Sequence, residues 1–349
     1  MPASNKREPY LSVELAARRR DSSMKLSKLG EFGLIERIRR AIPKGSGVHL
    51  GIGDDAAWVE NKSPSGLITS DLLIEGVHFD RRWTSLYALG YKVLAVNLSD
   101  IAAMGGLPAY VILSVGIPSS FRSEEVLEIY RGIRSLASKT GVSIIGGDTS
   151  AAEKLFISTC LIGHAPVRPV LRSGAKVGHD LYVTGTLGDS ALALKLLKKN
   201  PKGHPGTYLL SRHNRPVPRL RAGALLARRR LATAMIDVSD GLVQDLGHMC
   251  ELSGVGAIVY EERLPLSRAY RALTRDDGTS HALTGGEDYE LLFCARRQDR
   301  ARLQQLESAL DVPITWIGEC VPARQGIKVL DSRRKPIPIR TKGHDHFKH

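Results

Sequence analysis

Residues 234–254 read AMIDVSDGLVQDLGHMCELSG, and this stretch decides the fold class. A short apolar run leads into Asp237, as in a buried strand that ends on a polar residue. After the acidic turn, Leu242, Leu246 and Met249 recur at helical spacing until a closing glycine. A strand that passes through a turn into an amphipathic helix is the repeating unit of α/β proteins. The sequence therefore predicts an α/β (α+β) architecture with carboxylates at a strand–helix junction.

The same combination of aspartate with Gly, Ser or Thr occurs in four earlier segments, namely GDD at 53–55, TSD at 69–71, SD at 99–100 and GGDT at 146–149. Three of them follow strand-like apolar runs, and the fourth lies on the apolar stripe of a helix predicted over 85–104. Taken singly, any one of these aspartates is better explained as a turn residue or a helix cap. Five segments in one chain favour a convergent site instead. Carboxylates that converge repel one another and need a cation.

The donor set of these segments indicates which cation. Carboxylate and hydroxyl oxygens without accompanying Cys or His select a hard ion, magnesium before zinc or iron. Magnesium in such sites commonly bridges to phosphates, and the neighbouring glycines let backbone N–H groups approach phosphate oxygens. The chain has no G-x-x-x-x-G-K-[ST], no G-x-G-x-x-G after a strand, and no H-R-D with D-F-G. A P-loop or protein-kinase site is thus excluded.

Composition leaves a second class of function open. The chain has 349 residues, and 50 Lys plus Arg against 36 Asp plus Glu give a net charge of +14. This excess favours a polyanionic partner, so a nucleic-acid-binding protein is the alternative from another class. Aromatic residues make up only 5%, however, which argues against base stacking. The basic segment 200–230 is interpreted as a solvated surface rather than a phosphate-facing one.

Domain count and location follow from length and from what the chain lacks. We expect a basic N-terminal extension over 1–26, a domain over 27–164 and a second domain over 165–349. The four cysteines have no C-x-x-C spacing and are expected to be reduced. No stretch has the ~18–20 apolar residues of a membrane helix, and the N-terminus has no signal-peptide core. We therefore expect a cytoplasmic protein without a membrane partner.

Six motifs in order resemble the thiamine-monophosphate kinase family, within the superfamily named for aminoimidazole ribonucleotide synthetase: GIGDDAA, TSDLLIEGVHF, VNLSDIAAMGG, GGDTS, DVSDGLVQDLGH and TGGEDYELLF. The resemblance covers about residues 27–347. It implies a two-domain fold whose N-terminal mixed sheet completes a barrel across a homodimer, followed by a C-terminal α/β domain. It also implies an enzyme that uses ATP and magnesium to phosphorylate thiamine monophosphate to thiamine diphosphate.

The resemblance also implies roles for particular residues. Those that correspond to magnesium ligands are Asp54, Thr69, Ser70, Asp71, Asp100, Asp148, Asp237 and Asp240. Those that correspond to ATP contacts are Asp54, Tyr130, Gly147, Asp148, Arg172 and Ser239. His78 and Glu287 correspond to contacts with thiamine monophosphate. The chain departs from the family at His344, in KGHDHF, where the family often has an aromatic residue near the thiamine.

The implied chemistry needs no catalytic base. The second pKa of a phosphate monoester is about 6, so its oxygen is largely ionised near pH 7 and attacks the γ-phosphorus of ATP directly. The nearest alternatives are other ATP-dependent enzymes of the superfamily, such as aminoimidazole ribonucleotide synthetase, selenophosphate synthetase or a hydrogenase-maturation carbamoyl dehydratase. The last two typically carry an N-terminal or a C-terminal reactive Cys, and no Cys precedes Cys160 or follows Cys320 here.

Overall fold

The fold is taken from a computed structural model, which describes residues 34, 36–43, 45–50, 58–60, 66–274, 278–310 and 312–339. The chain divides into two compact units, the first made of residues 1–60, 72–91 and 111–159, and the second of residues 61–71, 92–110 and 160–349. The division passes through several strands and one helix. The expected extension over 1–26 lies outside the described residues, and the boundary near 165 stays a prediction.

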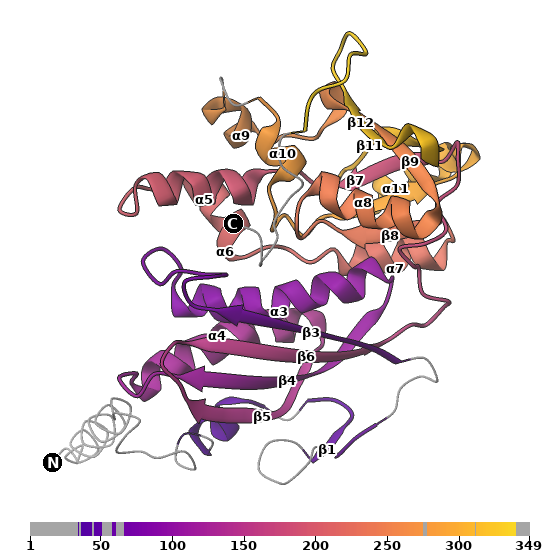
Figure 1. Cartoon of the computed structure of the whole chain (residues 1–349). Coiled ribbons are helices and arrows are strands. Elements are labelled where there is room, and N and C mark those ends of the chain that lie inside the picture. The colour runs from indigo at the N-terminus through magenta and orange to yellow at the C-terminus, as the bar shows by residue number, and fades with distance from the viewer. Residues whose placement is uncertain are drawn as a thin grey trace, which may run out of the picture. The chain divides into compact units, whose positions relative to one another are not determined.

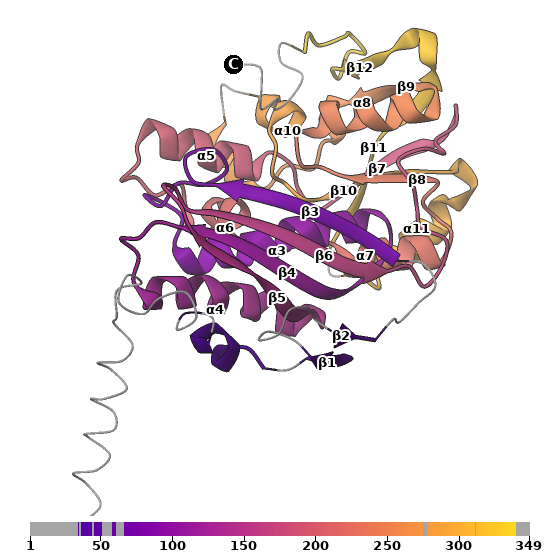
Figure 2. The same ribbon diagram turned by 60° about the horizontal axis from the view of Figure 1, so that its bottom comes forward.

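The N-terminal half of the chain is built on a four-stranded sheet. Its strands follow the order β3-β6-β4-β5 (Figures 1 and 2). The elements of this half are β1 (Val48–Leu50), β2 (Trp58–Val59), β3 (Gly66–Ile74), α3 (Leu86–Ala103), β4 (Leu107–Ile117), α4 (Ser123–Thr140), β5 (Ser143–Ala151) and β6 (Phe156–His164). β1 and β2 pair with each other antiparallel. The predicted helix over 85–104 is confirmed within a residue at each end.

Two glycines bring helices α3 and α4 into close contact. A Cβ on Gly90 of α3 would lie 1.9 Å from the carbonyl oxygen of Ile129 in α4. A Cβ on Gly132 of α4 would lie 2.0 Å from the carbonyl oxygen of Tyr87 in α3. Backbone meets backbone at both positions, so this crossing has no room for any side chain. The two helices are locked at a spacing that only glycine permits.

Two of the acidic segments lie in a different local setting from the one expected. Asp71 and Asp148 were expected after the ends of strands, but β3 continues to Ile74 and β5 continues to Ala151. Both aspartates are therefore strand residues. Successive side chains of a strand point to opposite faces of the sheet, so each aspartate projects from one face rather than from a turn. The polar TSD and GGDT segments resemble turns when read locally. Pairing with neighbouring strands keeps them extended.

The C-terminal part of the chain forms a six-stranded sheet with the order β12-β9-β11-β7-β10-β8. Its pairs are antiparallel except for β12 with β9. The strands are β7 (Asp180–Thr184), β8 (Ala234–Asp237), β9 (Val255–Tyr260), β10 (Leu291–Ala295), β11 (Ile314–Pro322) and β12 (Ile327–Leu330). The α-helices are α5 (Asp189–Lys199), α6 (Thr207–Asn214), α7 (Leu220–Arg228), α8 (Leu242–Ser253), α9 (Arg268–Leu273), α10 (Ser280–Thr284) and α11 (Arg300–Glu307), with 3-10 turns at Glu261–Arg263, Arg297–Asp299 and Ala323–Gln325.

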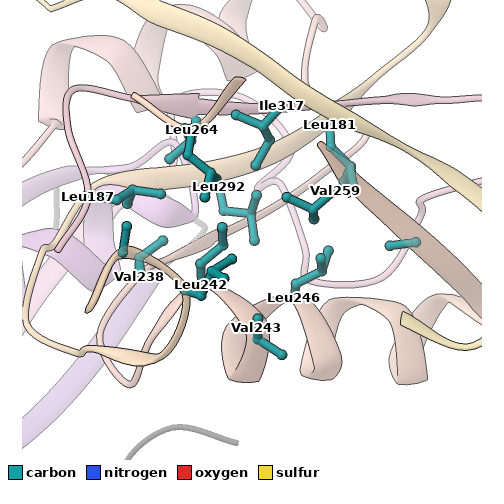
Figure 3. Close-up of a cluster of buried hydrophobic side chains, with 14 of the residues drawn as sticks. Leu181, Leu187, Val238, Leu242, Val243, Leu246, Val259, Leu264, Leu292 and Ile317 are labelled. Atoms are coloured by element: carbon teal, nitrogen blue, oxygen red, sulfur yellow. The ribbon is translucent and has the colours of Figure 1, made fainter. Parts of the chain in front are cut away.

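Alternating residues of the central strands supply two separate cores. Leu292 and Cys294 of β10 belong to a cluster that includes Leu242 and Leu246 of α8 (Figure 3). The intervening Phe293 belongs to a second cluster, formed with residues of α7 and α11. A sheet buried on both faces explains why β10 is apolar at every position. Burial of these two faces holds the acidic strand–helix junction of residues 234–254 in place.

Candidate functional site

Three of the expected aspartates interact in the second unit. Asp237 ends β8, Asp100 lies in the last turn of α3, and Asp71 lies in β3. Asp237 accepts a hydrogen bond from Ser99 Oγ at 2.6 Å, and Asp100 accepts one from Thr69 Oγ1 at 2.5 Å. An acid on the apolar stripe of a helix was expected to need a partner, and Thr69 is that partner.

The pKa values of these carboxyl groups record both burial and crowding. Burial first, and then the charge of Asp100, raise the pKa of Asp71 to about 7. The same two causes raise the pKa of Asp237 to about 8. Burial also raises the pKa of Asp100, against the hydrogen bond from Thr69 and the charge of Arg172. Three acids held in positions that disfavour their own ionisation need compensation by a cation.

The donor chemistry of this cluster fits a hard divalent cation. The Oδ2 atom of Asp71 is buried and has no hydrogen-bond partner. An unpaired buried carboxylate oxygen is costly, and a metal ion removes that cost. The nearby donors are oxygens of Asp and Thr, the type that magnesium prefers. Among the described residues alone, no three His, Cys, Asp or Glu side chains are already arranged to hold a metal. Asp54 lies outside the described residues and was therefore not part of that set.

The turn after β8 is organised by Asp245, which the sequence analysis did not single out. One oxygen of Asp245 accepts the backbone N–H groups of Ser239, Asp240 and Gly241, each at 3.1 Å. Asp240 is therefore not the helix cap, since the N-cap of α8 is Gly241 and no side chain caps it. Asp240 instead accepts a hydrogen bond from Gln244 at 3.0 Å. An acid in the first turn of a helix is the sequence signal that identifies such a residue.

A second loop, GGEDYE at 285–290, pairs with this turn through backbone hydrogen bonds. The N–H of Glu287 donates to Ser239 O at 2.7 Å, and the N–H of Tyr289 donates to Val238 O at 2.9 Å. Glu287 and Tyr289 both adopt left-handed backbone angles, with φ of 66° and 52°. Such angles cost side-chain-bearing residues about 1–3 kcal/mol each and are concentrated at functional sites. Tyr289 also lies within electrostatic range of Glu287 and the three aspartates, because these carboxylates, after burial, raise its pKa.

Glu290 anchors this loop through two arginines of the basic segment. Glu290 is fully buried and accepts hydrogen bonds from Arg212 at 2.7 Å, from Arg219 and from Thr184. The interpretation of residues 200–230 as a solvated surface is therefore wrong for Arg212 and Arg219. A local charge run does not reveal that a buried acid from a distant loop neutralises two of its members.

The remaining expected site residues are spread over the chain. Asp148 and Gly147 lie in β5 of the first unit, where a Cβ on Gly147 would meet Leu113 O at 1.9 Å. In the same unit, Tyr130 of α4 is only 6% exposed, and His78 Nδ1 accepts the N–H of Ile74 at 3.0 Å. Ser70 and Arg172 are exposed residues of the second unit. Asp54 and His344 lie outside the described residues.

Family models match the chain in two adjacent blocks. Residues 53–165 match the description "AIR synthase related protein, N-terminal domain", and residues 176–330 match its C-terminal domain. Together the two matches span more than half of the chain. The protein therefore belongs to the AIR synthase related proteins.

Individual relatives narrow this class. The thiamine-monophosphate kinase of Bacillus subtilis (strain 168) is 36% identical over 327 residues, which are 92% of this chain and 100% of that protein. The solved thiamine-monophosphate kinase of Stenotrophomonas maltophilia K279a has a TM-score of 0.77 at 39% identity, covering 86% of this chain and 96% of that one. A structure described as AaThiL complexed with AMPPCP and TMP has a TM-score of 0.72 at 35% identity, covering 93% and 99%. Within the class, the chain is a member of the thiamine-monophosphate kinase family.

Proposed function

We propose that the protein transfers the γ-phosphate of ATP to thiamine monophosphate with the help of magnesium, which yields thiamine diphosphate and ADP. The observation that carries this proposal is the cluster of Asp71, Asp100 and Asp237, because it is a set of oxygen donors that needs a cation. Membership of the family supports the choice of the two substrates. The acceptor is then a phosphate group rather than a hydroxyl of a free alcohol.

The proposed residue roles follow the family pattern. Magnesium would be held by Asp54, Thr69, Ser70, Asp71, Asp100, Asp148, Asp237 and Asp240. ATP would contact Asp54, Tyr130, Gly147, Asp148, Arg172 and Ser239. Thiamine monophosphate would contact His78, Glu287 and His344.

The chemistry assigned to the chain is positioning and charge compensation. At neutral pH the acceptor phosphate is already largely ionised, so no side chain has to remove a proton from it. Arg172, as an exposed cation within electrostatic range of Asp100 and Asp237, is suited to hold a phosphate of ATP. Magnesium held by these oxygen donors would supply charge neutralisation for the phosphates. We propose direct transfer without a phosphorylated enzyme.

The proposed assembly is a homodimer in which the N-terminal sheets complete a barrel. β3 is an edge strand of the four-stranded sheet, with Ile68 73% and Leu72 44% exposed. Exposed apolar residues on an unpaired edge strand favour pairing with another copy. Light scattering of the purified protein measures the mass of the assembly.

The proposed location is the cytoplasm. Among the described residues, no helix is both long and apolar enough to cross a membrane. All four cysteines are free, and three of them are buried. Unpaired thiols suit a reducing compartment, and the proposed reaction consumes ATP.

The proposed activity is tested by measuring ADP release with magnesium and ATP against thiamine monophosphate, free thiamine and formylglycinamidine ribonucleotide. We expect turnover only with thiamine monophosphate, and loss of turnover when magnesium is chelated. Asp240→Asn should weaken the response to limiting magnesium while the protein stays folded. Turnover with the ribonucleotide instead would assign the chain to the aminoimidazole ribonucleotide synthetase type.

A further inference from the structure

Glu287 is held by two buried nitrogen-bearing side chains that nothing above assigns to the reaction. Lys92 Nζ on α3 lies 2.8 Å from one carboxylate oxygen of Glu287. His213 Nδ1 on α6 lies 3.2 Å from the other oxygen. The side chains of Lys92 and His213 are each only 1% exposed, whereas that of Glu287 is 25% exposed. The carboxylate is thus anchored from its buried side and open on the other.

The two anchors also define the charge and orientation of Glu287. A carboxylate only accepts hydrogen bonds, so His213 Nδ1 carries the proton that points to Glu287, and Ser190 Oγ lies 3.0 Å from the same nitrogen. Burial alone would raise the pKa of Glu287, but the charge of Lys92 and the hydrogen bond from His213 lower it well below its usual range. The group therefore stays ionised although it is largely enclosed.

The geometry of Glu287 leaves acceptor capacity for a ligand. Each carboxylate oxygen has two lone pairs, and each has one anchor. The left-handed backbone at Glu287 and its hydrogen bond to Ser239 O hold the side chain at a defined place beside the DVSDG turn. A fixed, ionised and partly exposed carboxylate recognises an N–H donor.

We propose that Lys92 and His213 are positioning residues that hold Glu287 as a preorganised acceptor for an amino group on a nitrogen heterocycle of the substrate. This inference rests on the proposed function, in which that group is the amino group of the pyrimidine ring of thiamine monophosphate. Lys92 and His213 do not touch the substrate. They act by preventing Glu287 from rotating away or taking up a proton.

The test compares thiamine monophosphate with the analogue whose pyrimidine amino group is replaced by oxygen. The wild-type chain should prefer the amino substrate by about ten- to hundredfold in kcat/KM, as expected for a hydrogen bond to a charged group. Lys92→Met and Glu287→Gln should each lose most of this preference, while the KM for ATP changes little. Lys199→Met, an exposed lysine at the end of α5, is the matched control and should keep it.

Two further variants separate positioning from folding. An Asn amide nitrogen occupies about the position of His Nδ1, so His213→Asn should retain the preference and His213→Ala should lose it. The double variant with Lys92→Met and Glu287→Gln should regain the stability that Lys92→Met loses, because no unpaired buried charge remains. It should not regain the preference for the amino substrate. If the double variant regained both the stability and the preference for the amino substrate, the inference would be overturned. An unchanged preference in Lys92→Met would overturn it as well.

The same experiment distinguishes this inference from the proposed function. A wild-type chain that turns over neither compound overturns the proposed function and the substrate part of the inference. The positioning part is then decided by urea unfolding of the wild type, the two single variants and the double variant. A coupling near zero between Lys92 and Glu287 overturns it, and a clear coupling supports it.

Discussion

Asp245 provides the sharpest test of how the acidic turn is built. Its one oxygen accepts three backbone N–H groups of the turn that carries Ser239 and Asp240. Asp245→Ala removes this one acceptor and with it all three hydrogen bonds. The N–H of Gly241 belongs to a buried residue, whereas Ser239 and Asp240 are half-buried, so water replaces part of what those two lose. We expect a loss of about 2–4 kcal/mol in the free energy of unfolding.

Asp245→Asn separates the hydrogen-bonding oxygen from the charge. Burial first, and then the charge of Asp240, raise the pKa of Asp245 to about 7, although the three N–H groups act in the opposite direction. Because the pKa of Asp245 is raised in the folded chain, its ionisation at neutral pH lowers stability rather than adding to it, and an amide oxygen still accepts from the turn. We expect Asp245→Asn to cost less than about 1 kcal/mol.

Urea unfolding measures the stability of both Asp245 variants, and ADP release at varied magnesium measures their function. Asp245→Ala should require about tenfold more magnesium for half-maximal rate, because Asp240 loses its fixed position. The control is Asp331→Ala, since Asp331 Oδ1 accepts the N–H groups of Arg333 and Lys335 in a separate turn. It should lose stability without a change in magnesium response. Equal stability and equal magnesium response in Asp245→Ala and the wild type would refute this account of the turn.

Two further predictions concern helix packing and acid stability. Gly90→Ala should destabilise the protein by about 1–3 kcal/mol or more, because the new Cβ would collide with Ile129 O. A Cβ on Gly247 of α8 would make only an ordinary contact, with Ile327 Cδ1 at 3.9 Å, so Gly247→Ala should be neutral or stabilising in the same thermal unfolding series; equal losses in both variants would contradict the packing argument. Burial and the charge of Lys92 lower the pKa of His213 in the folded chain. As the pH drops below about 6.5, the imidazole is protonated in the unfolded chain but not yet in the folded one, so the free energy of unfolding falls. His213→Asn should lose less stability than the wild type between pH 7.5 and 5.5 in urea unfolding, and equal losses would exclude this role for His213.

The sequence predicted most reliably where the signal is local. Apolar periodicity and a following glycine placed the helix over 85–104, and α3 spans Leu86–Ala103 with Gly105 in the left-handed region. The strand–turn–helix of residues 234–254 is confirmed as β8 and α8, which ends at Ser253 with Gly254 as its C-cap. These features depend on residues a few positions apart, so one sequence contains the information needed to find them.

Prediction failed where a segment's conformation depends on distant neighbours. The TSD and GGDT segments are polar and glycine-containing, but pairing in the sheet makes them strand residues. The sequence did not predict five strands, namely β2, β6, β9, β11 and β12, because their apolar runs carry no distinctive boundary signal. Arg212 and Arg219 were interpreted as solvated. Both instead donate hydrogen bonds to the buried Glu290, which lies 78 residues from Arg212 and 71 residues from Arg219 in the chain.

By itself, the sequence determined the chemistry available to this protein: five aspartate segments with oxygen donors and glycines, in an order that resembles one family. It determined this because the type of donor is a property of the residue alone. Only the tertiary structure decided which groups act together. It joined Asp71, Asp100 and Asp237, placed Asp245 beneath their neighbouring turn, and surrounded Glu287 with Lys92 and His213. Charge state and orientation depend on burial and on partners far apart in the chain, and folding alone brings those partners together.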